Sequence, residues 1–236
     1  MRLLFILTII ASVHAAANGQ VLISILLGDK LNSDKVEFGL EGGLNISGID
    51  GVDPSSGRTG LNLGFYFDFK LKDPRWMIHT GVLVKSNMGA EDIKVYSLDD
   101  PDLDNIFSGG SVIRKLGYFN VPFMMKYQWQ NHIFVEGGPM FGLMNKSTDE
   151  FVATVKTKED LTYKLKIKDR YHPLDAGVMI GVGYRLQGGN GMNLQIRYYY
   201  GFVDTTIDDS MPGQYNRTLY INVGIPIGIG KKAAKE

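Results

Sequence analysis

The stretch DAGVMIGVGYRLQGGNGMNLQIRYYYGF, residues 175–202, alternates between bulky apolar residues and glycine or polar residues. A period of two is the side-chain period of a β-strand. The glycine-rich break GGNG, residues 188–191, is a tight-turn signal between two such strands. The stretch therefore predicts a β-hairpin with one apolar face.

The polar face of this hairpin indicates where its apolar face points. A soluble barrel fills its interior with bulky apolar side chains and turns polar ones to water. Here the polar face is mostly glycine with an occasional charge, as at Gly181, Arg185 and Arg197, which suits a narrow polar interior. The bulky face, with Val178 and Ile180, is therefore expected to face lipid. A closed transmembrane β-barrel is the sheet that meets lipid with every backbone group paired.

The same alternation recurs along the chain and predicts an all-β fold, an eight-stranded antiparallel transmembrane β-barrel with an up-and-down meander. The predicted strands cover residues 36–47, 59–71, 76–87, 116–129, 133–144, 175–187, 192–202 and 217–230. Short connections follow the second, fourth and sixth strands, and longer ones follow the others. Such barrels keep short turns in the periplasm, so both termini are expected there. Trp76 and Trp129 flank short turns, where an interfacial aromatic girdle is expected.

The N-terminal residues have the pattern of a secretory signal peptide. Arg2 precedes an apolar run at residues 3–13, and small residues follow, so cleavage is expected between residues 15 and 20. A short membrane anchor is the alternative, but the run is well under the roughly 20 residues that span a membrane. The expected organisation is a signal peptide (1–19), a periplasmic leader (20–35), the barrel (36–230) and a polar tail (231–236). The leader is either a short helix or strand at the barrel rim or a mobile segment.

The composition narrows the functional classes. The 236 residues include no cysteine, which excludes a disulfide scaffold, a thiol nucleophile, a cysteine metal site and a lipoprotein anchor. Lys and Arg number 25, Asp and Glu also 25, so the formal net charge of zero gives no electrostatic case for nucleic acid. An exported chain with apolar-faced strands is expected in the outer membrane of a Gram-negative bacterium, without a cofactor.

Charged residues occupy the predicted inward face of several strands. They are Glu37, Glu41, Asp68, Lys70, Lys85, Lys126, Glu136, Arg185 and Arg197, with His79 among them. A lumenal ion-pair network is the favoured interpretation, because an unpaired charge in a narrow barrel is costly. An ion or proton path is the alternative. Arg185 and Arg197 lie near the same turn and are expected to share acidic partners.

Two long connections carry opposite charges. In residues 88–115, Asp100, Asp102 and Asp104 occupy alternate positions. A solvated acidic loop is the favoured interpretation, because the glycine and the distal glutamate of an EF-hand are missing. A weak calcium site at these three residues is the alternative. In residues 145–173, two segments (151–156 and 161–168) alternate again and predict a projecting hairpin. Its basic residues are expected either to pair with the acidic loop or to bind anionic lipid headgroups. They are Lys156, Lys158, Lys164, Lys166, Lys168 and Arg170.

Catalysis is not expected. A Ser-His-acid device needs three groups within hydrogen-bond reach, but only His172 is placed near the extracellular rim, and no GxSxG element accompanies it. The favoured function is a non-enzymatic interaction or accessory protein; a lipid-modifying enzyme and a small channel are the alternatives. The expected partners are outer-membrane lipid and other envelope proteins, contacted through the extracellular loops or the periplasmic rim.

Several motifs carry a resemblance to a known family: GLEGGLNIS (39–47), YFNVPFMMKY (118–127), VEGGPMFGLM (135–144), and LDAGVMIGVGYRL with QIRYYYGF (174–186 and 195–202). Over roughly residues 21–230 the chain resembles the PorT-like outer-membrane β-barrel domain family of Bacteroidetes. The resemblance implies the barrel fold and the outer membrane and, through the family's name, a link to type IX secretion and gliding. The last strand departs from the usual pattern because it ends on IGIG, residues 227–230, and not on an aromatic residue.

Overall fold

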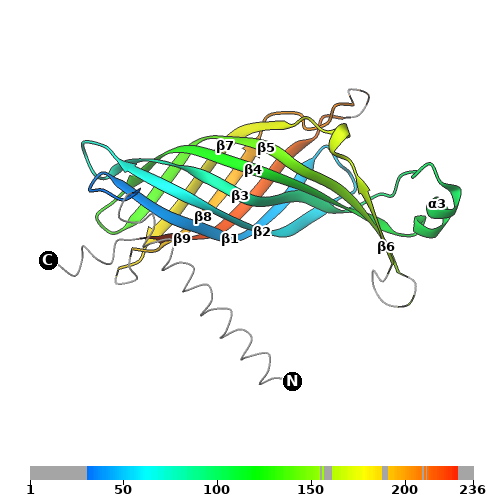
Figure 1. Ribbon diagram of the computed structural model, residues 1–236, viewed down its shortest axis with the longest axis horizontal. Helices are drawn as coiled ribbons and strands as arrows, with labels where there is room; N and C mark the ends of the chain where they lie inside the picture. The colour runs from blue at the N-terminus through cyan, green and yellow to red at the C-terminus, as the bar shows by residue number, and fades with distance from the viewer. Residues whose placement is uncertain are drawn as a thin grey trace, which may run out of the picture.

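The computed structural model describes residues 31–154, 156, 161–187, 191–208, 210 and 212–227. Antiparallel strands close into a tilted barrel (Figure 1). The strands of the ring are β1 (Val36–Asp50), β2 (Ser56–Lys70), β3 (Trp76–Ile93), β4 (Ser111–Gln128), β5 (Ile133–Ala153), β7 (Leu174–Arg185), β8 (Asn193–Gly201) and β9 (Tyr215–Pro226). The expected signal peptide, residues 20–30 of the leader, and residues 228–236 lie outside the described residues.

The ring closes between its first and last strands. β9 pairs antiparallel with β1, with Leu219 opposite Ile46. The remaining neighbours in the ring are strands that follow one another along the chain, except that β7 pairs with β5 and not with β6. β6 (Leu161–Lys166) pairs with the far end of β5 and lies outside the ring. The predicted eight-stranded up-and-down meander is confirmed. Among the described residues, no helix is long and apolar enough to cross a membrane.

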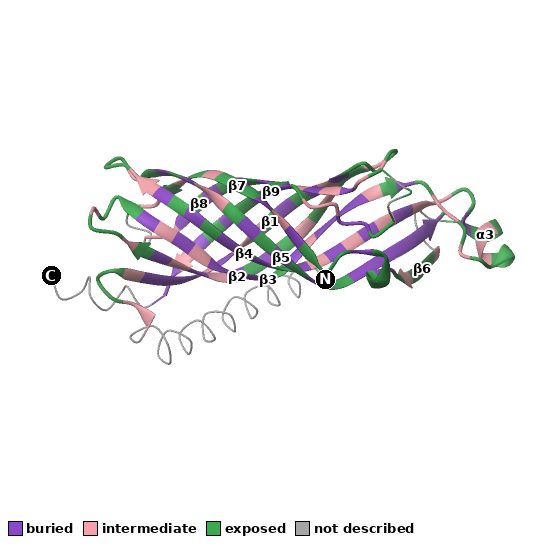
Figure 2. Cartoon of the chain, turned by 90° about the horizontal axis from the view of Figure 1, so that it is seen from above, coloured by how far each residue is buried: buried purple, intermediate pink, exposed green. Residues whose placement is uncertain are grey.

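Burial alternates along the strands, as Figure 2 shows by the change of colour from residue to residue. In the hairpin of β7 and β8, Ile180 and Tyr198 are exposed on the outside, while Met179 and Arg197 are buried inside. We call the outward apolar residues the apolar belt. Its exposed members include Leu44, Ile46, Leu61, Leu63, Phe119, Val121, Phe123, Met125, Phe141, Leu143, Val178, Ile180, Val182, Ile196, Tyr198, Ile221 and Val223.

Several strands are longer than the alternation predicted. Residues 88–93 continue β3, residues 111–115 begin β4, and residues 145–153 continue β5, where long connections were expected. Strand pairing explains the difference: β4 and β5 remain in register from Ser111 opposite Val152 down the barrel. The β5–β6 pairing forms the predicted projecting hairpin. Similarly, β1 and β2 continue toward each other and leave only residues 51–55 between them.

A short helix, α3 (Pro101–Phe107), lies between β3 and β4, and the 3-10 turn η2 (Lys168–Arg170) follows β6. Asp100 caps the helix by accepting hydrogen bonds from the amides of Asp102 and Leu103, and Pro101 takes the first turn, where no backbone donor is required. Phe107 packs against Phe151 with ring centroids 6.0 Å apart. We call α3, β6 and the ends of β3, β4 and β5 the extension; it projects from one end of the barrel (Figure 1).

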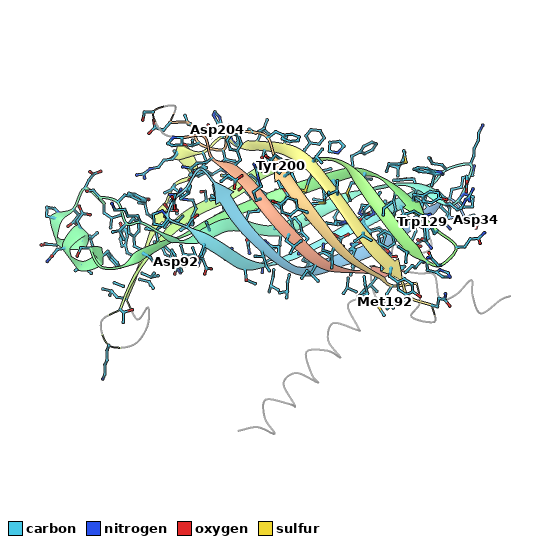
Figure 3. All side chains as sticks on the ribbon, turned by 180° about the vertical axis from the view of Figure 1, so that it is seen from behind. Asp34, Asp92, Trp129, Met192, Tyr200 and Asp204 are labelled. Atoms are coloured by element: carbon cyan, nitrogen blue, oxygen red, sulfur yellow. The ribbon has the colours of Figure 1, made fainter. Side chains whose placement is uncertain are left out.

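The opposite end carries the connections at residues 71–75 and 129–132; β7 and β9 end there, and β1 and β8 begin there. We call it the short-turn end. Figure 3 shows Trp129 and Met192 at this end, and Asp92 and Asp204 toward the other.

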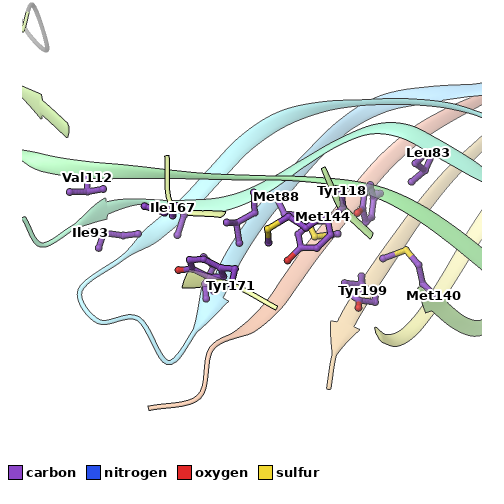
Figure 4. Close-up of a cluster of buried hydrophobic side chains, with 14 of the residues drawn as sticks. Leu83, Met88, Ile93, Val112, Tyr118, Met140, Met144, Ile167, Tyr171 and Tyr199 are labelled. Carbon is purple, nitrogen blue, oxygen red and sulfur yellow. The ribbon is translucent and has the colours of Figure 1, made fainter. Parts of the chain in front are cut away.

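The interior differs between the two ends. From the middle of the barrel into the extension it is filled by an apolar core, part of which Figure 4 shows, with Met88, Tyr118, Met140, Met144 and Tyr199 among its members. Toward the short-turn end the interior is polar, with Glu41, Asp68, Lys126 and Arg197 buried in it.

Lys85 does not point inward, and the prediction of a lumenal Lys85 is wrong. The register between β2 and β3 shifts after Leu63, which lies opposite Lys85, because Gly64 already lies opposite Leu83. This β-bulge leaves one extra residue on β3, so both Val84 and Lys85 are exposed on the outside and Ser86 returns to the interior. Alternation alone cannot reveal such an insertion.

Candidate functional site

Arg197 is the centre of a buried ion network at the polar end of the lumen. Its guanidinium donates to Glu136 on β5 at 2.5 Å and to Glu41 on β1 at 2.6 Å. The third nitrogen lies 2.9 Å from Nε2 of His79 on β3. The side chain of Arg197 is only 1% exposed, so it depends on these partners in place of water.

His79 connects Arg197 to a second ion pair. Its Nδ1 lies 2.6 Å from Asp68, and Lys126 donates to the other oxygen of Asp68 at 2.8 Å. Because Arg197 is always a donor, Nε2 of His79 must accept and the proton is assigned to Nδ1. Lys126 also lies over the ring of Phe134, 4.1 Å from its centroid. Six strands, β1 to β5 and β8, thus contribute to one chain of charge-assisted contacts.

Arg185 has a separate partner. It donates to Glu37 at 2.6 Å, and Glu37 also accepts from the hydroxyl of Tyr66 at 3.0 Å. The expectation that Arg185 and Arg197 share acidic partners is therefore wrong: β1 supplies Glu37 to one and Glu41 to the other. These two glutamates are four positions apart on β1, so the tilted strand places them at different depths of the lumen.

Lys70 is half-buried beside Arg185 in a shallow pocket at the short-turn end, and no ion pair of Lys70 is found among the described residues. Together with Lys85, it is one of two predicted network members that the structure does not bring into the network. The other seven predicted charges are each in an ion pair.

Glycine and asparagine complete the network. A Cβ added to Gly181 would lie 2.7 Å from Cγ of Arg197, so glycine is required where the long side chain lies over the wall. Asn222 on β9 donates to Glu41 at 2.7 Å and accepts from Asn62 at 2.9 Å. The sequence alternation places both asparagines on the inward face. Because they are uncharged, they were not predicted as members of an ion network.

The extension contains a second buried ion pair that the sequence analysis missed, because its residues fell in predicted loops. Arg114 on β4 donates to Asp149 on β5 at 2.6 Å and 2.8 Å. The hydroxyl of Tyr96 donates to the same carboxylate at 2.8 Å. Burial, followed by the negative charge of Asp149, raises the pKa of Tyr96, so it remains a neutral donor. The alternation in SVIRKLG, residues 111–117, is the signal that could have revealed Arg114.

The acidic loop uses its carboxylates locally. Asp100 caps α3, and Asp104 accepts from the amide of Leu98 at 2.7 Å and from the hydroxyl of Ser97 at 2.6 Å. These bonds lower the pKa of Asp104, with the Leu98 amide contributing most. Within the described ranges, no group of three His, Asp or Glu side chains is placed to hold a metal ion.

Three of the six basic residues predicted on the projecting hairpin contact groups other than the acidic triplet Asp100, Asp102 and Asp104. Lys164 lies 3.5 Å from Glu150, Lys168 donates to the carbonyl of Asn145, and Arg170 lies over the ring of Tyr96. Lys158 lies outside the described residues.

Aromatic side chains mark both edges of the apolar belt. At the short-turn end Trp76 and Trp129 both pack on Tyr127, with centroids 4.7 Å and 5.1 Å away. At the other edge Tyr200 packs on Phe202 and lies under Arg217. Amphipathic rings at two levels with an apolar band between them are typical of a wall that crosses a bilayer.

A closed ring, a continuous outward apolar belt and an ionic interior together define a transmembrane β-barrel whose lumen is filled by its own side chains. The sequence profile of the outer membrane protein beta-barrel domain matches residues 29–206. The chain belongs to this family and is an outer-membrane β-barrel protein. No curated protein sequence matches it significantly.

Solved outer-membrane barrels are similar in fold at low sequence identity. The attachment invasion locus protein Ail of Yersinia pestis is 11% identical with a TM-score of 0.42, covering 80% of this chain and 97% of that one. Neisserial surface protein A is 12% identical with a TM-score of 0.43, covering 81% and 99%. OprG of Pseudomonas aeruginosa is 11% identical with a TM-score of 0.37, covering 80% and 94%.

Proposed function

We propose that this outer-membrane barrel is a non-enzymatic interaction or accessory component, and that its extension contacts other envelope proteins. The observation that carries the proposal is that the extension is an ordered structure with its own ion pair, Arg114 with Asp149, and an apolar core that continues from the barrel. Simple loops closing the strands would need neither. Ile106 on α3 and Tyr163 on β6 nevertheless remain exposed, which supports a contact surface there.

The proposed orientation puts the extension outside the cell and the start of β1 and the end of β9 in the periplasm. The short connections and the Trp76–Trp129 girdle at the short-turn end support it. In this proposal residues 1–19 are a signal peptide and residues 20–35 a periplasmic leader. The lipid partner is the membrane around the apolar belt.

The finer family assignment is also a proposal. The motifs in residues 39–47, 118–127 and 135–144 support membership of the PorT-like group of Bacteroidetes, and with it a link to secretion. Neither a channel nor an enzyme gains support from the site. Met140 and Tyr199 fill the middle of the lumen, and both ring nitrogens of His79 are engaged in the ion network.

Site-specific photo-crosslinking in intact cells tests the proposal. A photoreactive phenylalanine analogue at Tyr163 or Ile106 is expected to give discrete protein adducts, while the same analogue at the lipid-facing Ile180 is expected to give none. Absence of adducts at both extension positions contradicts the proposal. Conductance above background in planar bilayers would then favour a channel. Loss of lipid A modification in a deletion strain, restored by wild type but not by His172→Ala, would favour an enzyme.

A further inference from the structure

Basic side chains surround an outward groove of about 420 Å³ at the base of the extension. Arg58, Lys115, Lys146 and Lys164 line it with the carboxylate of Glu150, and Arg58 also lies 3.9 Å from the carboxylate of Glu91. Lys115 and Lys164 both approach Glu150, so this carboxylate is shared between two ammonium groups. The groove therefore keeps an excess of positive charge, although the whole chain has a net charge of zero.

The groove begins where the apolar belt ends. On β4 the outward row passes from Val121 and Phe119 to Lys115, and on β5 it passes from Leu143 to Asn145 and Lys146. A lipid whose acyl chains lie on this part of the belt would carry its headgroup at the level of these lysines. The position of the groove at the edge of the apolar belt therefore suits a ligand that lies at the membrane interface.

Two β-bulges turn lysines outward at this level. Strict alternation would direct Lys85 and Lys146 into the lumen. The register shift after Leu63 exposes Lys85, and the shift between Gly117 and Tyr118 places both Asn145 and Lys146 on the outside. Lys85 lies two residues before Asn87, which also lines the groove. Both irregularities increase the outward positive charge at the boundary of the belt.

We propose that this groove binds the phosphate groups of an anionic outer-leaflet lipid, with the acyl chains on the apolar belt. Lysines that project separately suit a phosphate that approaches from the membrane plane, since each ammonium acts as a point charge with rotatable donors. The inference deepens the lipid contact of the proposed function and rests on its orientation, with the groove in the outer leaflet.

Native mass spectrometry of the purified barrel in detergent tests the inference, with diphosphoryl lipid A as the probe. Wild type is expected to retain it at least tenfold better than dephosphorylated lipid A. Lys115→Gln/Lys146→Gln is expected to lower the affinity about 30-fold, because each cation near a membrane surface contributes roughly a factor of five. Lys72→Gln/Lys94→Gln removes the same charge from exposed positions outside the groove and is expected to leave the affinity unchanged.

Equal loss in both double variants would overturn the inference, because it would show general charge attraction. Displacement of the lipid by millimolar inorganic pyrophosphate would also overturn it, since the site would then recognise free phosphate. Heat-modifiable mobility on gels verifies that each variant is folded. The orientation is tested separately by labelling Ser108→Cys in intact cells with an impermeant maleimide, since the chain has no cysteine of its own. Labelling without lipid selectivity would refute only the groove.

Discussion

Arg197 on β8 donates a 2.6 Å hydrogen bond to Glu41 on β1, 156 residues earlier in the chain. Only β9 separates these strands in the closed ring, so the contact exists only after the barrel has closed. Both side chains are almost completely buried, and Glu136 depends on the same guanidinium. Barrel closure and charge neutralisation are therefore coupled through one arginine.

Arg197→Met is expected to destabilise the barrel by about 3–5 kcal/mol, because Glu41 and Glu136 would lose their buried cation. Urea unfolding in micelles, followed by tryptophan fluorescence, measures the change. Arg75→Gln is the control: Arg75 pairs with Asp73 at 2.6 Å but is exposed, and its loss is expected to have little effect on stability because water screens the pair. Similar effects for both variants would contradict a central role for Arg197.

Gly183→Val is expected to destabilise the barrel by about 1–3 kcal/mol through overpacking. A Cβ at this position would lie 2.2 Å from Cζ of Phe134 and 2.6 Å from the carbonyl oxygen of Leu194. Gly48→Ala is the matched control, since nothing lies within 4 Å of its added Cβ. Thermal unfolding of both variants checks the prediction, which fails if the valine is tolerated as well as the alanine.

Ile180→Arg is expected to cost about 2–4 kcal/mol of stability in a bilayer, because the residue lies on the lipid-facing side of β7. Ile207→Arg places the same charge at an exposed position between β8 and β9 and is expected to have little effect. Reversible folding into phospholipid vesicles measures both. A soluble wall would accept either arginine, so equal stabilities would refute the membrane-facing assignment.

Protonation of Asp104 is expected to loosen the segment before α3. The pKa of Asp104 is lowered from about 3.8 by its bonds from Leu98 and Ser97, so its stabilising contribution is fully present above that pH. The contribution is lost as the pH falls through the lower pKa of the folded state. The amide resonance of Leu98 in an NMR titration should report this midpoint. A midpoint at or above 3.8 would show that the bonds do not form.

The orientation of the wall was predictable from the sequence because the side-chain period of a strand is local. Ile180 and Arg197 needed only their neighbours along the chain to be assigned outward and inward. Seven of the predicted inward charges are in ion pairs for the same reason: a charge on the inward face has only other inward groups to meet. The sequence carried no comparable local pattern for a catalytic or calcium site.

The sequence alone determined the barrel, its two faces and the sites of its short turns. Only the tertiary structure decided that Lys85 leaves the lumen, that Arg185 and Arg197 take different glutamates, and that residues 145–153 continue as β5 into the extension. The physical reason is that a bulge, a cross-barrel partner and a strand end each depend on the register of a neighbouring strand. Register is set by pairing between segments that are distant in the chain, and closure of the ring fixes it for all of them together.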